Sequence, residues 1–173
     1  TAIGVVTNEP RPLAPTVAAR RAGKPLEWDA VARSLRLIAA DSDVMIVEGV
    51  GGIMVPMDEK YTVLDVAVAL GVPAIVVARP NLGTINHTLL TVNALRDAGV
   101  YVGGVVINQY RADGASVAEE TNPRAIEKWG KVPVLCIVPD VNESITSKLP
   151  ADVLAAVAMV DWSAIVARAA GPS

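Results

Sequence analysis

The chain has 173 residues, and more than half of them are apolar, which favours one packed domain over residues 1–173. Its formal net charge is −3 without a block of basic residues, so the sequence lacks the clustered Lys/Arg surface that nucleic-acid binding requires. No apolar run approaches the ~18 residues of a membrane-spanning helix. The expected partners are therefore small molecules or other proteins.

The N-terminal part of the chain predicts one helix and one strand. Residues Thr7–Pro15 are rich in proline, which excludes a regular helix or a central strand. Apolar residues at helical spacing predict a helix over Leu26–Ala40. The apolar run Val44–Val47 predicts a short buried strand, which ends at Glu48 and a glycine turn.

A helix and a second strand follow. Residues Thr62–Leu70 predict a helix with Thr62 as its N-cap and Asp65 at the offset of a capping-box variant. Gly71 ends this helix because glycine readily adopts the left-handed conformation found after helices. The apolar run Ala74–Ala78 then predicts another buried strand.

The C-terminal half continues the alternation. We expect Pro123 at the first position of its helix and a break near Asp161 in the last helical region. The predicted helices are Ile85–Ala98, Asn122–Trp129 and Ala151–Ala169, and the predicted strands are Val102–Ile107 and Val134–Val138.

This alternation predicts an α/β fold in which the four apolar runs form parallel strands of one sheet with right-handed crossovers. Ligands of such sheets bind at the carboxyl ends of the strands. We therefore expect the residues that follow the four strands to lie at one edge, namely Glu48, Arg79, Asn108 and Pro139.

Glu48 is followed closely by Gly49, Gly51 and Gly52. A carboxylate at a strand end suits Mg²⁺, which takes one or two protein carboxylates and completes its shell with water and phosphate oxygens. The glycines let the backbone approach a ligand and expose its N–H groups. A tight loop with a solvated glutamate is the alternative interpretation.

The turn before His87 leads into a helix, so the N-terminus of this helix can bind an anion without a cationic side chain. In the alternative, Thr84 or Asn86 caps an ordinary helix. His87 is the only histidine and lacks a Cys or His partner for a metal site, so we interpret it as a structural residue.

Three further features of the sequence carry weaker indications. The amide of Asn108 offers a donor and an acceptor to a purine edge, although for this residue taken alone a turn-forming role is the better explanation. The turn Pro139–Asp140 could flank a base. Cys136, the only cysteine, lies in an apolar run and is interpreted as a buried strand residue, which agrees with a reducing cytoplasm.

Together these segments resemble the dethiobiotin synthetase family in order and spacing, from about Pro10 to about Asp140. The resemblance implies a three-layer, parallel-sheet nucleotide-binding fold of the phosphate-loop NTPase type. The segments that carry it are Val47–Gly52, Pro73–His87, Gly104–Asn108 and Asn122–Pro123 leading into Val132–Leu135.

The family closes a cyclic urea. A carbamate forms from CO₂ on 7,8-diaminononanoate, ATP phosphorylates it, and the neighbouring amine closes the ring to dethiobiotin with loss of phosphate. The resemblance therefore implies ATP and Mg²⁺ as cofactors and a homodimer whose subunits share the active site.

The resemblance also assigns roles to individual residues. Glu48 corresponds to the magnesium-binding glutamate, Asn108 to the asparagine that reads adenine, and Pro139 to the loop near the base. The turn that receives the substrate carboxylate serves the neighbouring subunit's site. The residues expected to bind substrate are Gly51, Gly52, Gly83, Thr84, Ile85 and Asn86.

The chain departs from the family at its N-terminus. Family members begin with a strand, a Gly-x-x-x-x-x-Gly-Lys-Thr phosphate loop and its helix, and the next strand carries a substrate lysine and a magnesium-binding aspartate. Lys24 follows no apolar strand and precedes Pro25 instead of a hydroxyl residue, so we reject it as part of a phosphate loop. No catalytic residue is assigned. We expect the natural protein to be longer, because interior strands without partners leave backbone groups unsatisfied.

Two other functions remain open at this stage. The chain could be a non-catalytic module that keeps the dimer and the anion site. It could also be related to the amide-forming enzymes of cobalamin synthesis, which use a nucleophilic cysteine in a separate glutaminase domain. Cys136 lies within a strand, and 173 residues are too few for both domains.

Overall fold

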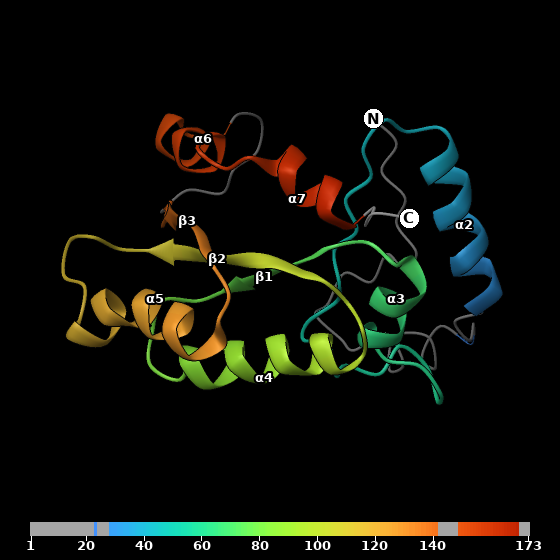
Figure 1. The fold of residues 1–173 in the computed structure, drawn as a ribbon, viewed down its shortest axis with the longest axis horizontal. Helices are drawn as coiled ribbons and strands as arrows, with labels where there is room; N and C mark the ends of the chain where they lie inside the picture. Colours follow the sequence, from blue (N-terminus) through green and yellow to red (C-terminus); the bar gives the residue numbers. More distant parts are fainter. Residues whose placement is uncertain (1–22, 24–27, 142–148, 170–173) are drawn as a thin grey trace. The chain divides into compact units, whose positions relative to one another are not determined.

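The computed structural model describes residues 23, 28–141 and 149–169. The chain divides into two units, Thr1–Val66 and Ala67–Ser173, and each is described by itself (Figure 1). The proline-rich segment Thr7–Pro15 and the Gly23–Lys24–Pro25 step lie largely outside the described residues. Within the described ranges, no helix is both long and apolar enough to cross a membrane.

The first unit contains helix α2 (Trp28–Ala40) and the start of α3 (Val63–Leu70). Trp28 at the start of α2 stacks on Tyr61, with ring centroids 4.6 Å apart. At the start of α3, the backbone N–H and the hydroxyl of Thr62 donate to the carboxylate of Asp65 at 2.6 and 2.7 Å. These hydrogen bonds hold the pKa of Asp65 below its ordinary value and confirm the predicted pairing of Thr62 with Asp65 at the helix start.

The predicted strand Val44–Val47 is wrong, because the structure has no strand over these residues. Val44 and Ile46 are 75% and 90% exposed. An extended segment becomes a strand only through backbone hydrogen bonds to a neighbouring strand, and the residues that the structure describes provide none for this segment. The sheet accordingly contains three of the four predicted strands.

The second unit is built on that sheet. Strands β1 (Ala74–Ala78), β2 (Val102–Tyr110) and β3 (Val134–Pro139) lie in the order β1-β2-β3, and both pairs are parallel. Helices α4 (Thr84–Asp97) and α5 (Val117–Gly130) cover one face, and α6 (Ala151–Ala158) and α7 (Trp162–Ala169) lie on the other (Figure 1). The predicted parallel α/β class and its three layers are confirmed.

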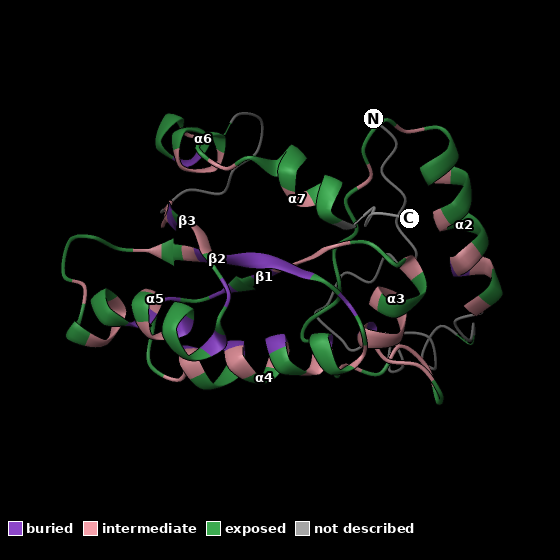
Figure 2. Ribbon diagram, in the orientation of Figure 1, coloured by how far each residue is buried: buried purple, intermediate pink, exposed green. Residues whose placement is uncertain are grey.

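The core of this unit follows the alternation of side chains along β2. Val105 and Ile107 are fully buried, as is Ile126 of α5. In Figure 2, the purple of buried residues is most continuous along β2. Val106 points to the other layer, where it packs with Val138 of β3 and Val153 of α6. The central strand β2, which pairs with β1 and β3, is therefore covered by helices on both of its faces.

The prediction for α5 needs a correction. The helix begins at Val117, not at Asn122, and Pro123 lies inside it and not at its first position. The reason is a capping box: the hydroxyl of Ser116 accepts from the backbone N–H of Glu119, whose carboxylate accepts from the backbone N–H of Ser116. The break near Asp161 is confirmed, since α6 ends at Ala158 and α7 begins at Trp162.

Candidate active site at the carboxyl edge of the sheet

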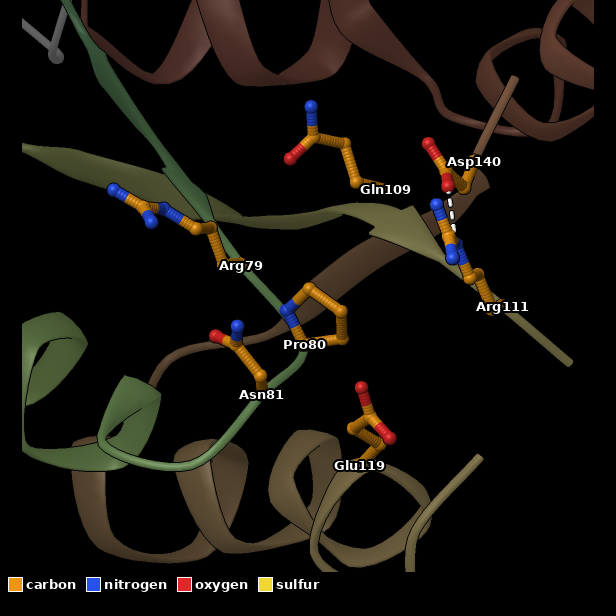
Figure 3. Close-up of a pocket in the computed structure, with 7 residues that line it drawn as sticks. All are labelled: Arg79, Pro80, Asn81, Gln109, Arg111, Glu119 and Asp140. Carbon is orange, nitrogen blue, oxygen red and sulfur yellow. Dashed lines mark hydrogen bonds and ion pairs between the residues drawn. The ribbon is translucent and has the colours of Figure 1, made fainter. Parts of the chain in front are cut away.

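The three strands end at one edge of the sheet, and a pocket of about 330 Å³ lies there (Figure 3). One wall comes from the loop that follows β1, another from the last residues of β2, and a third from the start of α5. The lining residues are Arg79, Pro80, Asn81, Gln109, Arg111, Glu119 and Asp140. The structure thus gathers polar and charged side chains where parallel sheets bind ligands.

A second pocket, of about 370 Å³, shares Arg111 and Asp140 with the first. Its wall includes Pro139, at the end of β3, together with Ile137 and the loop after β2. Pro139 therefore lies in a pocket wall at the expected edge.

Asn108 lies within β2, which extends to Tyr110, three residues beyond the predicted end at Ile107. The side-chain oxygen of Asn108 accepts the backbone N–H of Gln109 at 2.9 Å. Gln109 has a φ of 62°, in the left-handed region that few residues other than glycine adopt. The side chain of Asn108 lines neither pocket, but it lies beside Gln109, which lines the first.

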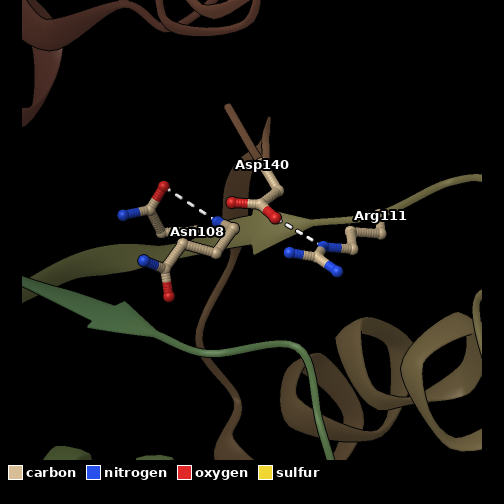
Figure 4. Close-up of polar contacts among 4 residues, drawn as sticks. Asn108, Arg111 and Asp140 are labelled. Atoms are coloured by element: carbon tan, nitrogen blue, oxygen red, sulfur yellow. Dashed lines mark hydrogen bonds and ion pairs between the residues drawn. The ribbon is translucent and has the colours of Figure 1, made fainter. Parts of the chain in front are cut away.

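An ion pair joins the ends of β2 and β3 (Figure 4). The Nε of Arg111 donates to the carboxylate of Asp140 at 2.5 Å, and the backbone N–H of Asp140 donates to the carbonyl of Tyr110 at 2.9 Å. The side chain of Asp140 is 16% exposed and that of Arg111 is 70% exposed. The pair was not predicted, because its members are 29 residues apart and only the sheet brings them together.

Glu119 completes the first pocket from the start of α5. The backbone N–H and hydroxyl of Ser116 donate to its carboxylate, and these bonds hold the pKa of Glu119 below its ordinary value, with a smaller contribution from Arg111. The pocket is therefore lined by two carboxylates, Glu119 and Asp140, and by two guanidinium groups, those of Arg79 and Arg111.

The N-terminus of α4 has no side-chain cap. Its N-cap is Gly83, with a φ of 93°, and the hydroxyl of Thr84 lies buried 3.4 Å from that of Thr88. The alternative in which Thr84 or Asn86 caps the helix is therefore wrong. The first i to i−4 backbone bond of the helix runs from the N–H of His87 to the carbonyl of Gly83. The N–H groups of Ile85 and Asn86 come before this first donor and have no acceptor within the helix.

Glu48, Gly51 and Gly52 lie in the first unit. Glu48 is exposed in an irregular segment, and Gly51 has a φ of 79°. A Cβ on Gly49 would lie 2.7 Å from the side chain of Val63, so the turn after Glu48 packs closely on α3. Carboxylate oxygens, such as those of the exposed Glu48 side chain, are among the ligands that Mg²⁺ prefers. The described residues contain no group of three or more His, Cys, Asp or Glu side chains that could hold a metal by themselves.

Cys136 lies in β3, partly buried beside the cluster of Val106, Val138 and Val153. Burial raises the pKa of its thiol, which disfavours the reactive thiolate. The interpretation of Cys136 as a strand residue is confirmed, and its surroundings do not favour a nucleophile.

The fold and this edge define an α/β protein with polar pockets at the carboxyl ends of a parallel sheet. Residues 7–148 match the sequence model of a family described as an AAA domain. The chain belongs to this AAA domain family.

Individual relatives show more specifically which proteins this chain is similar to. The chain is 41% identical over 133 residues to the ATP-dependent dethiobiotin synthetase BioD of Bacillus licheniformis, a match that covers 77% of this chain and 56% of that protein. It is 44% identical over 128 residues to the protein of the same name from Bacillus subtilis strain 168, covering 74% of this chain and 55% of the relative. The predicted resemblance to the dethiobiotin synthetases is confirmed.

The chain spans about half the length of the curated relatives it matches. Among solved structures, the cell division ATPase MinD of Pyrococcus furiosus is similar, with 22% identity and a TM-score of 0.48. That match covers 67% of this chain and 48% of the other.

Proposed function

We propose that the protein containing this chain is a dethiobiotin synthetase. It joins 7,8-diaminononanoate and CO₂ to give dethiobiotin and converts ATP to ADP and phosphate. The similarity to proteins named ATP-dependent dethiobiotin synthetase carries this proposal. The pockets at the carboxyl edge of the sheet support it, because they present donors and acceptors where a nucleotide and a polar substrate would bind.

The nucleotide base is proposed to bind beside Asn108 and Pro139. The backbone N–H of Gln109 occupies one lone pair of the Asn108 oxygen. The oxygen keeps a second lone pair, and the amide keeps two N–H donors, so Asn108 can pair with the N6 and N7 positions of adenine.

The substrate carboxylate is proposed to bind at the N-terminus of α4, from Gly83 to Asn86. The N–H groups of Ile85 and Asn86 can donate to it, and the helix dipole adds about half a positive charge at this end. Gly51 and Gly52 are proposed to contact the substrate through their backbone. As in the resemblance, the turn serves the neighbouring subunit of a homodimer.

Glu48 is proposed to hold Mg²⁺ together with phosphate oxygens of ATP. The ion would neutralise charge on the phosphate groups, while Glu48 fixes its position through a carboxylate oxygen. The remaining proposals are one domain over residues 1–173, a cytoplasmic location and partners limited to the small-molecule substrates and a second copy. The single partly buried cysteine supports the location.

Growth tests the function directly. A bacterial strain that lacks its own dethiobiotin synthetase should grow without biotin when it expresses the protein that contains this chain. Supplying dethiobiotin should restore growth of the strain without the protein. If cells that contain the folded protein still grow only with dethiobiotin, the proposal is wrong.

Replacing Asn108 by alanine should raise the KM for ATP by about tenfold, because two neutral hydrogen bonds to the base are lost. The KM for the diamine should change by less than about twofold. The measurement is steady-state kinetics with each substrate varied in turn. Thr121→Ala, an exposed change on α5, is the control. An unaltered KM for ATP in the Asn108 variant would show that this residue does not read the base.

A further inference from the structure

Asn122 is a buried polar residue in the second turn of α5, with only 5% of its surface exposed. Its side-chain nitrogen donates to the carbonyl of Pro80 at 2.7 Å and approaches the carbonyl of Asn81 at 3.4 Å. These partners are 42 and 41 residues away in the sequence. The side chain therefore joins α5 to the loop between β1 and α4.

That loop carries two parts of the candidate site. Pro80 and Asn81 line the first pocket (Figure 3). The carbonyl of Asn81 also accepts the backbone N–H of Thr84 at 3.2 Å, and Gly83 between them has a φ of 93°. The position of the Asn81 carbonyl therefore influences the direction of the first N–H groups of α4.

No side chain of the loop caps α4. Besides the backbone bond from Thr84 to Asn81, the turn is held by the side-chain hydrogen bonds of Asn122, which come from a helix that begins with a capping box. Glu119 lies three residues before Asn122, on the same side of α5, and lines the pocket that Pro80 and Asn81 also line. One face of α5 thus contributes to the pocket and fixes the opposite wall.

We propose that Asn122 is a positioning residue for the anion-binding turn Gly83–Asn86. Its amide holds the carbonyls of Pro80 and Asn81 so that the N–H groups of Ile85 and Asn86 converge on one point. The identity of the anion as the substrate carboxylate rests on the proposed function, whereas the ordering of the turn by Asn122 does not.

Hydrogen exchange in the complete chain tests the ordering. Asn122→Asp keeps the shape but removes the donor and places an oxygen against two carbonyl oxygens. The amide of Thr84 should then exchange about tenfold faster or more, because a buried hydrogen bond of ordinary strength corresponds to about a factor of ten. The amide of Val105, which donates to Pro133 in the sheet, should keep its rate.

The matched control is Thr121→Ala. The hydroxyl of Thr121 donates to the carbonyls of Val117 and Ala118 in its own helix, so its loss should leave the exchange of both amides unchanged. Asn122→Ala is the second variant. It should speed the exchange of the Thr84 amide in the same way, without introducing a charge. If the amides of Thr84 and Val105 exchange faster by the same factor in both variants, Asn122 supports the fold as a whole and the proposal is wrong. Failure of either variant to fold leads to the same conclusion. Unchanged exchange at Thr84 would also overturn it.

Kinetics of the complete enzyme give the second measurement. Asn122→Asp should raise the KM for the diamine about tenfold while kcat falls by less than about threefold, because the turn binds substrate away from the reacting atoms. Loss of kcat without a change in that KM would contradict the positioning role. The unmodified protein could make no dethiobiotin while Asn122→Asp still speeds the exchange of the Thr84 amide and not that of Val105. In that case the proposed function is wrong and the positioning role stands.

Discussion

Replacing Glu48 by glutamine should reduce the turnover of the complete enzyme by about a hundredfold or more, the scale on which removal of one preorganised electrostatic group acts. Glutamine keeps the size of the side chain but replaces the carboxylate oxygen that Mg²⁺ prefers by a neutral amide. Glu48 is exposed, so the fold should not change. Circular dichroism and the unfolding midpoint should match those of the unmodified protein.

The decisive measurement is the initial rate as a function of Mg²⁺ concentration. The Glu48→Gln variant should need more Mg²⁺ for half of its maximal rate. Asp43→Asn, the same carboxylate-to-amide change at an exposed position five residues earlier, should keep the dependence of the unmodified protein. An identical magnesium dependence for Glu48→Gln would refute the metal-binding role.

Replacing Gly83 by valine should raise the KM for the diamine by at least about tenfold and that for ATP much less. Gly83 has a φ of 93°, where a β-branched residue is strained by about 1–3 kcal/mol. A Cβ there would lie 3.5 Å from the ring of His87, so the larger valine side chain would crowd the entry to the turn. Steady-state kinetics on both substrates measure the effect.

Gly99→Val is the control for backbone strain. Gly99 follows α4 with a φ of 80°, and no atom lies within 4 Å of the place of its Cβ. Both variants should therefore lose comparable stability, but only Gly83→Val should lose diamine binding. Equal effects of the two variants on the diamine KM would assign the loss to strain and not to the site.

A substrate analogue probes the charge at the same turn. An amide in place of the carboxylate of the diamine should bind about tenfold more weakly or worse, since a charged hydrogen bond contributes about 1.5–3 kcal/mol. If the amide binds as tightly as the acid, the turn Gly83–Asn86 is not an anion site.

The second unit was predictable because its strands are continuous apolar runs with helices on both faces. The run Val44–Val47 has the same composition, yet composition cannot supply the neighbouring strand that a ladder requires. The start of α5 could have been found, because Ser116 and Glu119 stand at capping-box spacing. The preference of proline for the first turn of a helix drew attention to Pro123 instead.

The residues that line the pockets were predictable where they stand at the carboxyl end of a strand: Arg79 follows β1 directly, and Pro139 is the last residue of β3. The left-handed backbone of Gln109 and the bonds from Asn122 to Pro80 leave no local pattern in the sequence. They depend on contacts between segments that only the fold brings together. For the same reason, the pair Arg111–Asp140 became visible only with the register of β2 and β3.

Product formation by the complete protein tests the central claim most directly. The purified protein should convert 7,8-diaminononanoate, isotope-labelled bicarbonate as the source of CO₂, and ATP with Mg²⁺ into dethiobiotin that carries one labelled carbon. One ADP and one phosphate should appear for each dethiobiotin formed. Tight binding of the diamine without labelled dethiobiotin would instead identify a binding module, and hydrolysis of ATP without incorporation of the label would identify a different reaction.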